Sequence, residues 1–207
     1  MQNSLFDNLD DNKVFKRFDL PNAEIEFYPD FFSAFESQIF FSALKQKTNW
    51  RQEKMFMYGK EVNFPRLTAW YGDNDKDYSF SGIKLKPYSW TETLINIKNS
   101  IQKVENSNFN SVLLNLYRNG QDSINWHTDA EKELGQNPII ASVSFGATRK
   151  FQLKHKYDKT LETVNIELLS GSLLIMKGET QHFWVHQVPK TNKVIGERIN
   201  LTFRTIK

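Results

Sequence analysis

Residues 139–178, IIASVSFGATRKFQLKHKYDKTLETVNIELLSGSLLIMKG, decide the fold class. Four short runs in this stretch are apolar or alternate between apolar and polar residues, namely 139–146, 149–155, 163–169 and 171–178. Runs of this length, rich in β-branched and aromatic side chains, predict β-strands. The Ser170-Gly171 pair is typical of a turn between two of them. This stretch therefore predicts four consecutive strands.

The same character extends in both directions from this stretch. Four more runs of the same kind are SVLLNLYR (111–118), INWHTD (124–129), HFWVHQV (182–188) and RINLTFR (198–204). Eight short strands at this spacing favour a sandwich or jelly roll over alternating strand–helix units. We therefore expect an α+β fold that is mainly β, with the β core in residues 110–207.

The N-terminal half has a different pattern. Apolar residues at helical spacing predict a helix over 30–47 with Asp30 as its N-cap, the inner face being Phe31, Phe35, Ile39, Phe40, Ala43 and Leu44. A second helix is expected over 89–104, with Leu94, Ile97 and Ile101 facing inward. The aromatic, Gly- and Pro-containing stretch 55–90 favours short strands and hairpins. We expect three parts in one structural unit: a leader (1–30), the helices and hairpins (31–109) and the β core (110–207).

Composition excludes several classes of protein. No apolar run approaches the ~20 residues that span a bilayer, and the acidic N-terminus lacks the basic and apolar segments of a secretory signal. We therefore expect no membrane association and a cytoplasmic location, or a nuclear one in a eukaryote. The chain has no cysteine, which excludes disulfides, Cys-ligated zinc, iron–sulfur clusters and thiol nucleophiles.

The net charge of +3 is unevenly distributed. The leader carries three basic and seven acidic residues, a balance of −4, so the remainder carries +7. A basic body is compatible with a polyanionic partner, although an ordinary solvated surface explains the charge equally well. The role of the leader stays open: it is a tail or a packed strand.

The motif His127-x-Asp129 suggests a metal site. On a strand or at its end, the two side chains point to the same side, and an imidazole beside a carboxylate can chelate a divalent metal. A distant histidine would complete the two-His-one-carboxylate set of non-haem iron oxygenases. His186 is well placed for this, with His182 as a competitor. A polar loop is the alternative, because H-x-D alone arises often by chance.

The last predicted strand presents a polar face beside an apolar one. Arg198, Asn200, Thr202 and Arg204 share one side, and Ile199, Leu201 and Phe203 the other. Two guanidinium groups suit a dicarboxylate, which they bind through paired hydrogen bonds. Asn115 and Tyr117 show the same split in run 111–118. The alternative for each strand is a solvent-exposed sheet face.

Taken in order, these segments resemble the AlkB family of Fe(II)/2-oxoglutarate dioxygenases, and most closely its branch that repairs alkylated DNA. The resemblance covers about residues 55–206 and implies a double-stranded β-helix (jelly-roll) core with N-terminal helices and a nucleotide-recognition lid. It implies Fe(II), 2-oxoglutarate and O2, with His127, Asp129 and His186 as the metal ligands. The 2-oxoglutarate residues would be Asn115, Tyr117, Arg198, Asn200, Thr202 and Arg204. Arg198 would pair with the distal carboxylate and Arg204 would lie nearer the metal.

The resemblance also implies a set of substrate-binding residues, Tyr58, Arg66, Tyr78, Phe80, Ser81 and Glu131. Tyr58 corresponds to an aromatic finger that fills the gap left by a flipped base, and core packing is the alternative for these aromatics. Two positions depart from the family pattern. Ala130 stands where some duplex-repairing relatives have a second acid, and Trp126 is bulkier than expected before the first ligand.

The function that this resemblance implies is oxidative dealkylation of 1-methyladenine and 3-methylcytosine in DNA, with release of formaldehyde, succinate and CO2. We expect a monomer whose partner is nucleic acid. Three alternatives remain open: the same chemistry on RNA, a non-catalytic binder of damaged bases, and a zinc hydrolase that uses the same ligands. Lesion range and strand preference are not determined by these motifs.

Overall fold

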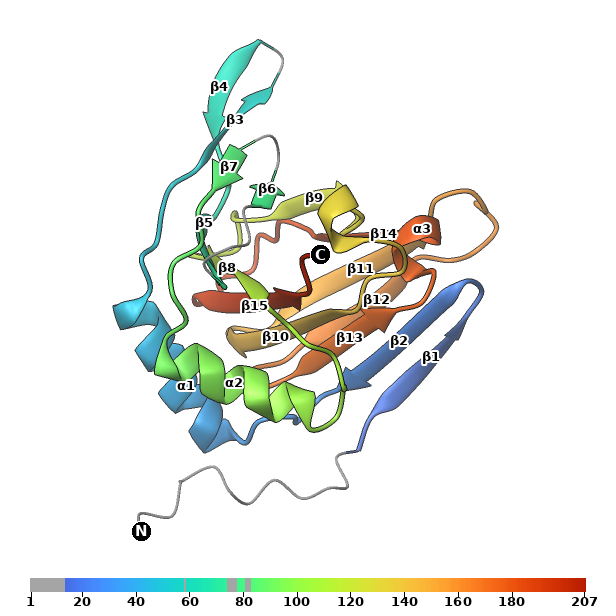
Figure 1. The fold of residues 1–207 in the computed structure, drawn as a ribbon. Helices are drawn as coiled ribbons and strands as arrows, with labels where there is room; N and C mark the ends of the chain where they lie inside the picture. Colours follow the sequence, from blue (N-terminus) through green and yellow to red (C-terminus); the bar gives the residue numbers. More distant parts are fainter. Residues whose placement is uncertain (1–13, 58, 74–77, 81–82) are drawn as a thin grey trace.

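Two sheets form the core of the fold, and the larger one contains the C-terminal strand. The computed structural model describes residues 14–57, 59–73, 78–80 and 83–207. Seven antiparallel strands form this major sheet, in the spatial order β1 (Lys16–Leu20), β2 (Ala23–Tyr28), β13 (Leu173–Lys177), β10 (Ile140–Gly146), β15 (Arg198–Arg204), β8 (Ser111–Tyr117) and β5 (Leu67–Gly72). Strands distant in sequence are thus neighbours, as β2 and β13 are (Figure 1).

A minor sheet of four strands faces the major one. Its order is β12 (Val164–Leu168), β11 (Arg149–His155), β14 (Trp184–Val188) and β9 (Ile124–His127). Apolar side chains from both sheets, such as Phe151 and Leu153 of β11 and Leu113 and Leu174 of the major sheet, form one buried cluster between them. The eight strands expected in residues 110–207 are β8 to β15, and the predicted mainly-β jelly-roll fold is confirmed.

The remaining short elements lie at the edges of this sandwich. They are the hairpins β3 (Lys54–Met57) with β4 (Lys60–Asn63) and β6 (Tyr78–Phe80) with β7 (Ile83–Leu85), the 3₁₀ helix η1 (Lys132–Leu134) and the short helix α3 (Thr180–Phe183). The β3–β4 hairpin projects away from the two sheets at the top of Figure 1. Strands β1 and β2, which lie within the expected leader, extend the major sheet through β13.

Two helices cover the outer face of the major sheet (Figure 1). In α2 (Glu92–Gln102) the predicted inward residues Leu94, Ile97 and Ile101 are all buried, against Val143, Leu201 and other sheet residues of a second apolar cluster. The strands β8, β10 and β15 are therefore buried on both sides. None of the helices formed by the described residues is long and apolar enough to cross a membrane.

The other helix, α1, differs from its prediction at the N-terminus. It spans Ala34–Lys47 and its N-cap is Ser33, not Asp30. Ser33 and Glu36 form a reciprocal capping box, which satisfies two backbone N–H groups at once. Ser37, Phe40 and Leu44, which are three and four residues apart, form the buried face, whereas Phe35 and Ile39 lie on another side of the helix and are exposed. The predicted inward position of Phe35 and Ile39 is wrong.

Candidate metal and cosubstrate site

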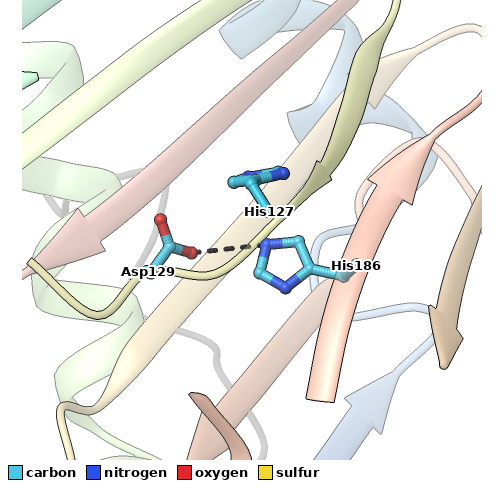
Figure 2. A group of neighbouring side chains, drawn as sticks. All are labelled: His127, Asp129 and His186. Carbon is cyan, nitrogen blue, oxygen red and sulfur yellow. Dashed lines mark ion pairs between the residues drawn. The ribbon is translucent and has the colours of Figure 1, made fainter. Parts of the chain in front are cut away.

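The sheet register places two histidines side by side. His127 at the end of β9 is the direct partner of His186 on β14, and their ring centroids lie 4.3 Å apart. Phe151 of the neighbouring strand stacks on His186 with the centroids 5.2 Å apart. The two imidazoles therefore share the inner face of the minor sheet (Figure 2).

Asp129 completes the cluster from just beyond the end of β9. Its Oδ2 lies 3.5 Å from His186 Nε2, and one ligand atom from each of the three residues lies within 4.8 Å of the others (Figure 2). Arg204 donates to the other oxygen, Oδ1. His182, the competitor, lies exposed on α3 with its Nε2 2.8 Å from Asn137 Oδ1 and is not part of the cluster. The structure thus brings together His127, Asp129 and His186.

The surroundings keep these side chains in the forms that bind a cation. Burial, together with neighbouring His186, lowers the pKa of His127 to about 4, so its ring is neutral at pH 7. Burial alone would raise the pKa of Asp129, but Arg204 and the two histidines outweigh it and hold the pKa well below its usual range. A neutral imidazole and an ionised carboxylate are the metal-ligating forms. This donor set suits a borderline divalent metal such as Fe(II).

A face of polar side chains lies across the cavity from the minor sheet. Strands β8 and β15 are paired so that Arg198 is opposite Tyr117 and Asn200 is opposite Asn115. The predicted residues Asn115, Tyr117, Arg198, Asn200, Thr202 and Arg204 are all buried, and they line one cavity of about 40 Å³ together with His127, Asp129 and His186. The polar side of β15 is therefore a pocket wall and not an exposed sheet face.

Arg198 is a buried cation with hydrogen-bonding capacity to spare. It is 1% exposed, its Nη2 donates to Ser144 Oγ at 2.9 Å, and its guanidinium lies 5.1 Å from the centre of the Tyr117 ring. Its Nε and Nη1 make no hydrogen bond within the described part of the chain. Burial lowers the pKa of Arg198 to about 10, so it still carries its charge at pH 7. Unmet donors on a buried cation fit a carboxylate ligand.

Asn200 and Thr202 of this face are hydrogen-bonded to each other and to the neighbouring strand. Asn200 Nδ2 donates to Ser142 Oγ (2.9 Å) and to the Val143 carbonyl (3.0 Å), and Thr202 Oγ1 donates to Asn200 Oδ1 (3.2 Å). These bonds hold the wall of the cavity in a single arrangement. Ser142 and Ser144 were not identified from the sequence as site residues, although their alternation in run 139–146 puts them on one face.

A wider groove of about 650 Å³ opens beside His127 and is lined by Arg66, Trp126 and Glu131 among others. Arg66 is 3% exposed, and its Nε donates to Asn115 Oδ1 at 2.7 Å, so it also braces the cosubstrate wall. Glu131 Oε2 is buried and has no hydrogen-bond partner within the described residues. These two predicted substrate residues thus line the same groove as His127, one of the three candidate metal ligands.

The other predicted substrate residues are not tested by the structure. Tyr58 and Ser81 lie outside the described residues. Tyr78 and Phe80 belong to strand β6, but their side chains are not among those that the structure describes. Their roles stay predictions. Trp126, the bulky residue before the first ligand, lies under Lys154, whose Nζ is 4.2 Å from the ring centre.

Comparisons with known proteins agree with this geometry. Residues 24–204 match the 2OG-Fe(II) oxygenase superfamily. The chain is 44% identical over 186 residues to the Bos taurus alpha-ketoglutarate-dependent dioxygenase alkB homolog 3, covering 86% of this chain and 64% of that protein. It is 38% identical to the Mus musculus DNA oxidative demethylase ALKBH2, covering 86% of this chain and 79% of that protein. The chain thus spans less than two thirds of the length of the alkB homolog 3 protein.

A solved structure supports the fold independently. The structure of OsALKBH1 superposes with a TM-score of 0.62 at 18% identity, over 93% of this chain and all of that one (100%). At this identity the likeness concerns the fold alone. The family match spans most of the chain, and both the name of the family and the residues of the cavity point to Fe(II) and 2-oxoglutarate. The chain therefore belongs to the 2OG-Fe(II) oxygenase superfamily and, within it, to the AlkB family.

Proposed function

We propose that this chain is an Fe(II)- and 2-oxoglutarate-dependent dioxygenase that removes methyl groups from the ring nitrogens of bases in DNA. One observation carries the proposal: the His127–Asp129–His186 cluster and the unmet donors of Arg198 share one buried cavity. The names of the relatives, an alpha-ketoglutarate-dependent dioxygenase and a DNA oxidative demethylase, support the same activity.

In this proposal the cavity has a metal-binding end and a cosubstrate-binding end. His127, Asp129 and His186 would hold Fe(II). Arg198 would bind the distal carboxylate of 2-oxoglutarate, and Arg204 would lie at the metal end, where it already holds Asp129. Asn115, Tyr117, Asn200 and Thr202 would line the cosubstrate between these ends. When bound, the metal and cosubstrate would supply oxidation by O2: one oxygen atom would go to 2-oxoglutarate, which yields succinate and CO2, and the other to the methyl group, which would leave as formaldehyde.

The chain's own residues would select and position the base. Enzymes that act on a base take it out of the stack, and the groove beside His127 would receive it. The Glu131 carboxylate, with one buried oxygen unbonded within the described residues, would attract the positive charge of 1-methyladenine or 3-methylcytosine. Arg66 and, in the lid, Tyr58, Tyr78, Phe80 and Ser81 would complete the contacts. Aromatic stacking of a base contributes roughly 1–3 kcal/mol.

The test is mass spectrometry of oligonucleotides that carry 1-methyladenine. Single-stranded DNA, double-stranded DNA and RNA versions are each incubated with the protein, Fe(II), 2-oxoglutarate and air, beside a His127→Ala control. Loss of the methyl group with formation of succinate, and no loss in the control, is the expected result. Turnover of 2-oxoglutarate without demethylation would keep the enzyme class and refute the substrate. Demethylation of RNA alone would show that the substrate is RNA. Turnover of neither the oligonucleotide nor 2-oxoglutarate would refute the enzyme and favour a non-catalytic binder.

A further inference from the structure

The backbone that carries Asp129 lies outside the hydrogen-bond ladder that fixes the two histidines. His127 and His186 are partners in the β9–β14 register, so the sheet sets their spacing. Strand β9 ends at His127, two residues before Asp129. The Asp129 N–H donates to a side chain instead: Gln181 Oε1, at 2.9 Å. The Gln181 side chain thus satisfies and holds the main chain of Asp129, as strand pairing holds that of the two histidines.

Gln181 is itself held firmly. It lies on α3 and is 1% exposed, and its main-chain carbonyl accepts a hydrogen bond from Lys156 Nζ at 2.9 Å. The preceding Thr180 anchors the helix: its hydroxyl donates to the Lys177 carbonyl (2.6 Å) and accepts from the Glu24 N–H (2.9 Å). These contacts fix the main chain from which the Gln181 side chain extends.

The surroundings also fix which way the Gln181 amide faces. Its Oε1 meets the Asp129 N–H, and its Nε2 lies 3.7 Å from the thioether sulfur of Met176. A thioether is a weak acceptor but cannot donate. The reversed amide would set an N–H against the Asp129 N–H, so the observed orientation is the one with a hydrogen bond to Asp129.

We propose that Gln181 is a positioning residue for Asp129 in the metal site, an inference that rests on the function proposed above. Gln181 holds the main chain of Asp129, and Arg204 holds its Oδ1. The remaining oxygen, Oδ2, is left on the side of His186 Nε2. Residues that orient metal ligands typically change metal affinity by about 10–100-fold when removed. Gln181 acts through Asp129 and is not itself a ligand.

The experiment measures binding of Mn²⁺ alone, in the absence of 2-oxoglutarate and of activity. Free Mn²⁺ is followed by electron paramagnetic resonance during titration of the wild type, Gln181→Met and His182→Ala. Methionine approximates the length of glutamine but replaces the amide oxygen by a thioether, a much weaker acceptor. His182 is an exposed neighbour on the same helix. We expect the dissociation constant to rise about 10–100-fold in Q181M and to stay within about twofold in H182A. Equal affinity in folded Q181M and wild type would overturn the inference.

Thermal unfolding separates positioning from a general packing role. A purely structural effect lowers the midpoint equally with and without Mn²⁺, whereas weaker binding also shrinks the Mn²⁺-induced rise. We expect that rise to be smaller in Q181M, and an undiminished rise would refute the proposal. A wild type that binds no Mn²⁺ would instead refute the proposed metal site itself.

A measurement on the unmodified chain covers the case in which Q181M does not fold. Amide hydrogen exchange of the metal-free wild type should show a protected Asp129 N–H, since it is hydrogen-bonded and buried. Exchange at the rate of an unstructured peptide would overturn the inference.

Discussion

Substitution of Arg198 by methionine tests the cosubstrate site most directly. Arg198 keeps two buried donors, Nε and Nη1, without a partner within the described residues. A hydrogen bond to a charged group contributes about 1.5–3 kcal/mol. Taking the lower value for each of two bonds to a carboxylate gives a loss of about 3 kcal/mol, or on the order of 100-fold in affinity.

The same substitution should affect the stability of the ligand-free protein only modestly. It removes the hydrogen bond from the charged guanidinium to Ser144, at a cost of about 1.5–3 kcal/mol, but it also removes a buried charge with unmet donors. These two effects oppose each other. We therefore expect R198M to lose 2-oxoglutarate affinity without a matching fall in the unfolding midpoint.

Arg149 provides a matched control. It is also a buried arginine against the Tyr117 ring, 5.5 Å from its centre, but it does not line the cavity. Its guanidinium donates to the carbonyls of Asn119, Asp122 and Pro189. Arg149→Met should therefore lower the midpoint, because three carbonyls lose a donor, and leave 2-oxoglutarate affinity within about threefold.

The assay is isothermal titration of 2-oxoglutarate into Mn²⁺-loaded protein under nitrogen, with unfolding midpoints measured on the same samples without ligand. Binding by R198M within about threefold of the wild type would refute the assignment of Arg198. Equal losses of affinity in R198M and R149M would show that the fold around Tyr117, and not the donors of Arg198, controls binding.

Three further predictions follow from individual contacts. Ser33→Ala removes the α1 capping box and should cost about 1 kcal/mol, a fall of about 2–4 °C in the calorimetric midpoint; an unchanged midpoint would contradict the cap. Burial would raise the pKa of Glu26, but Arg17 and Lys177 outweigh it and lower the pKa below its ordinary 4.5. This stabilisation is present above pH 4.5 and is lost as the pH falls through the lowered value, so Glu26→Gln should be less stable than the wild type at pH 7 and converge with it in acid. The free energy of unfolding is measured in urea at several pH values, and a difference between the two proteins that does not change with pH would refute this. Glu131→Gln should reduce preference for cationic 1-methyladenine over a neutral alkylated base by about tenfold in kcat/KM, and an unchanged ratio would refute the role of its charge.

Local patterns were sufficient for the eight strands of residues 110–207 and for one face of the site. Alternation in the run 198–204 predicted that Arg198 and Arg204 share a side, and β15 has this arrangement because side chains alternate along any strand. The inner residues of α2 were equally predictable from their helical spacing. The order of motifs was sufficient to predict the family.

Other features depend on pairing between distant segments. The N-cap of α1 is not one of them, because Ser33 and Glu36 are three residues apart and their capping-box signature was overlooked in favour of Asp30. The His-x-Asp motif by itself left His182 as a competitor of His186, and the β9–β14 register is what places His186 opposite His127. The two histidines have the same local chemistry, so the choice between them depends on what each one contacts.

The contact between Gln181 and Asp129 shows this limit most clearly. Nothing in the residues around Gln181 marks it, since an isolated glutamine in a four-residue helix has no periodicity to interpret. Its role arises because the strand ends at His127 and leaves a backbone N–H that must be satisfied from a segment 52 residues away. Residue types along the chain determined the strands, the chemistry available to them and the family. Folding alone determined which buried groups satisfy one another, because hydrogen bonds form between neighbours in space.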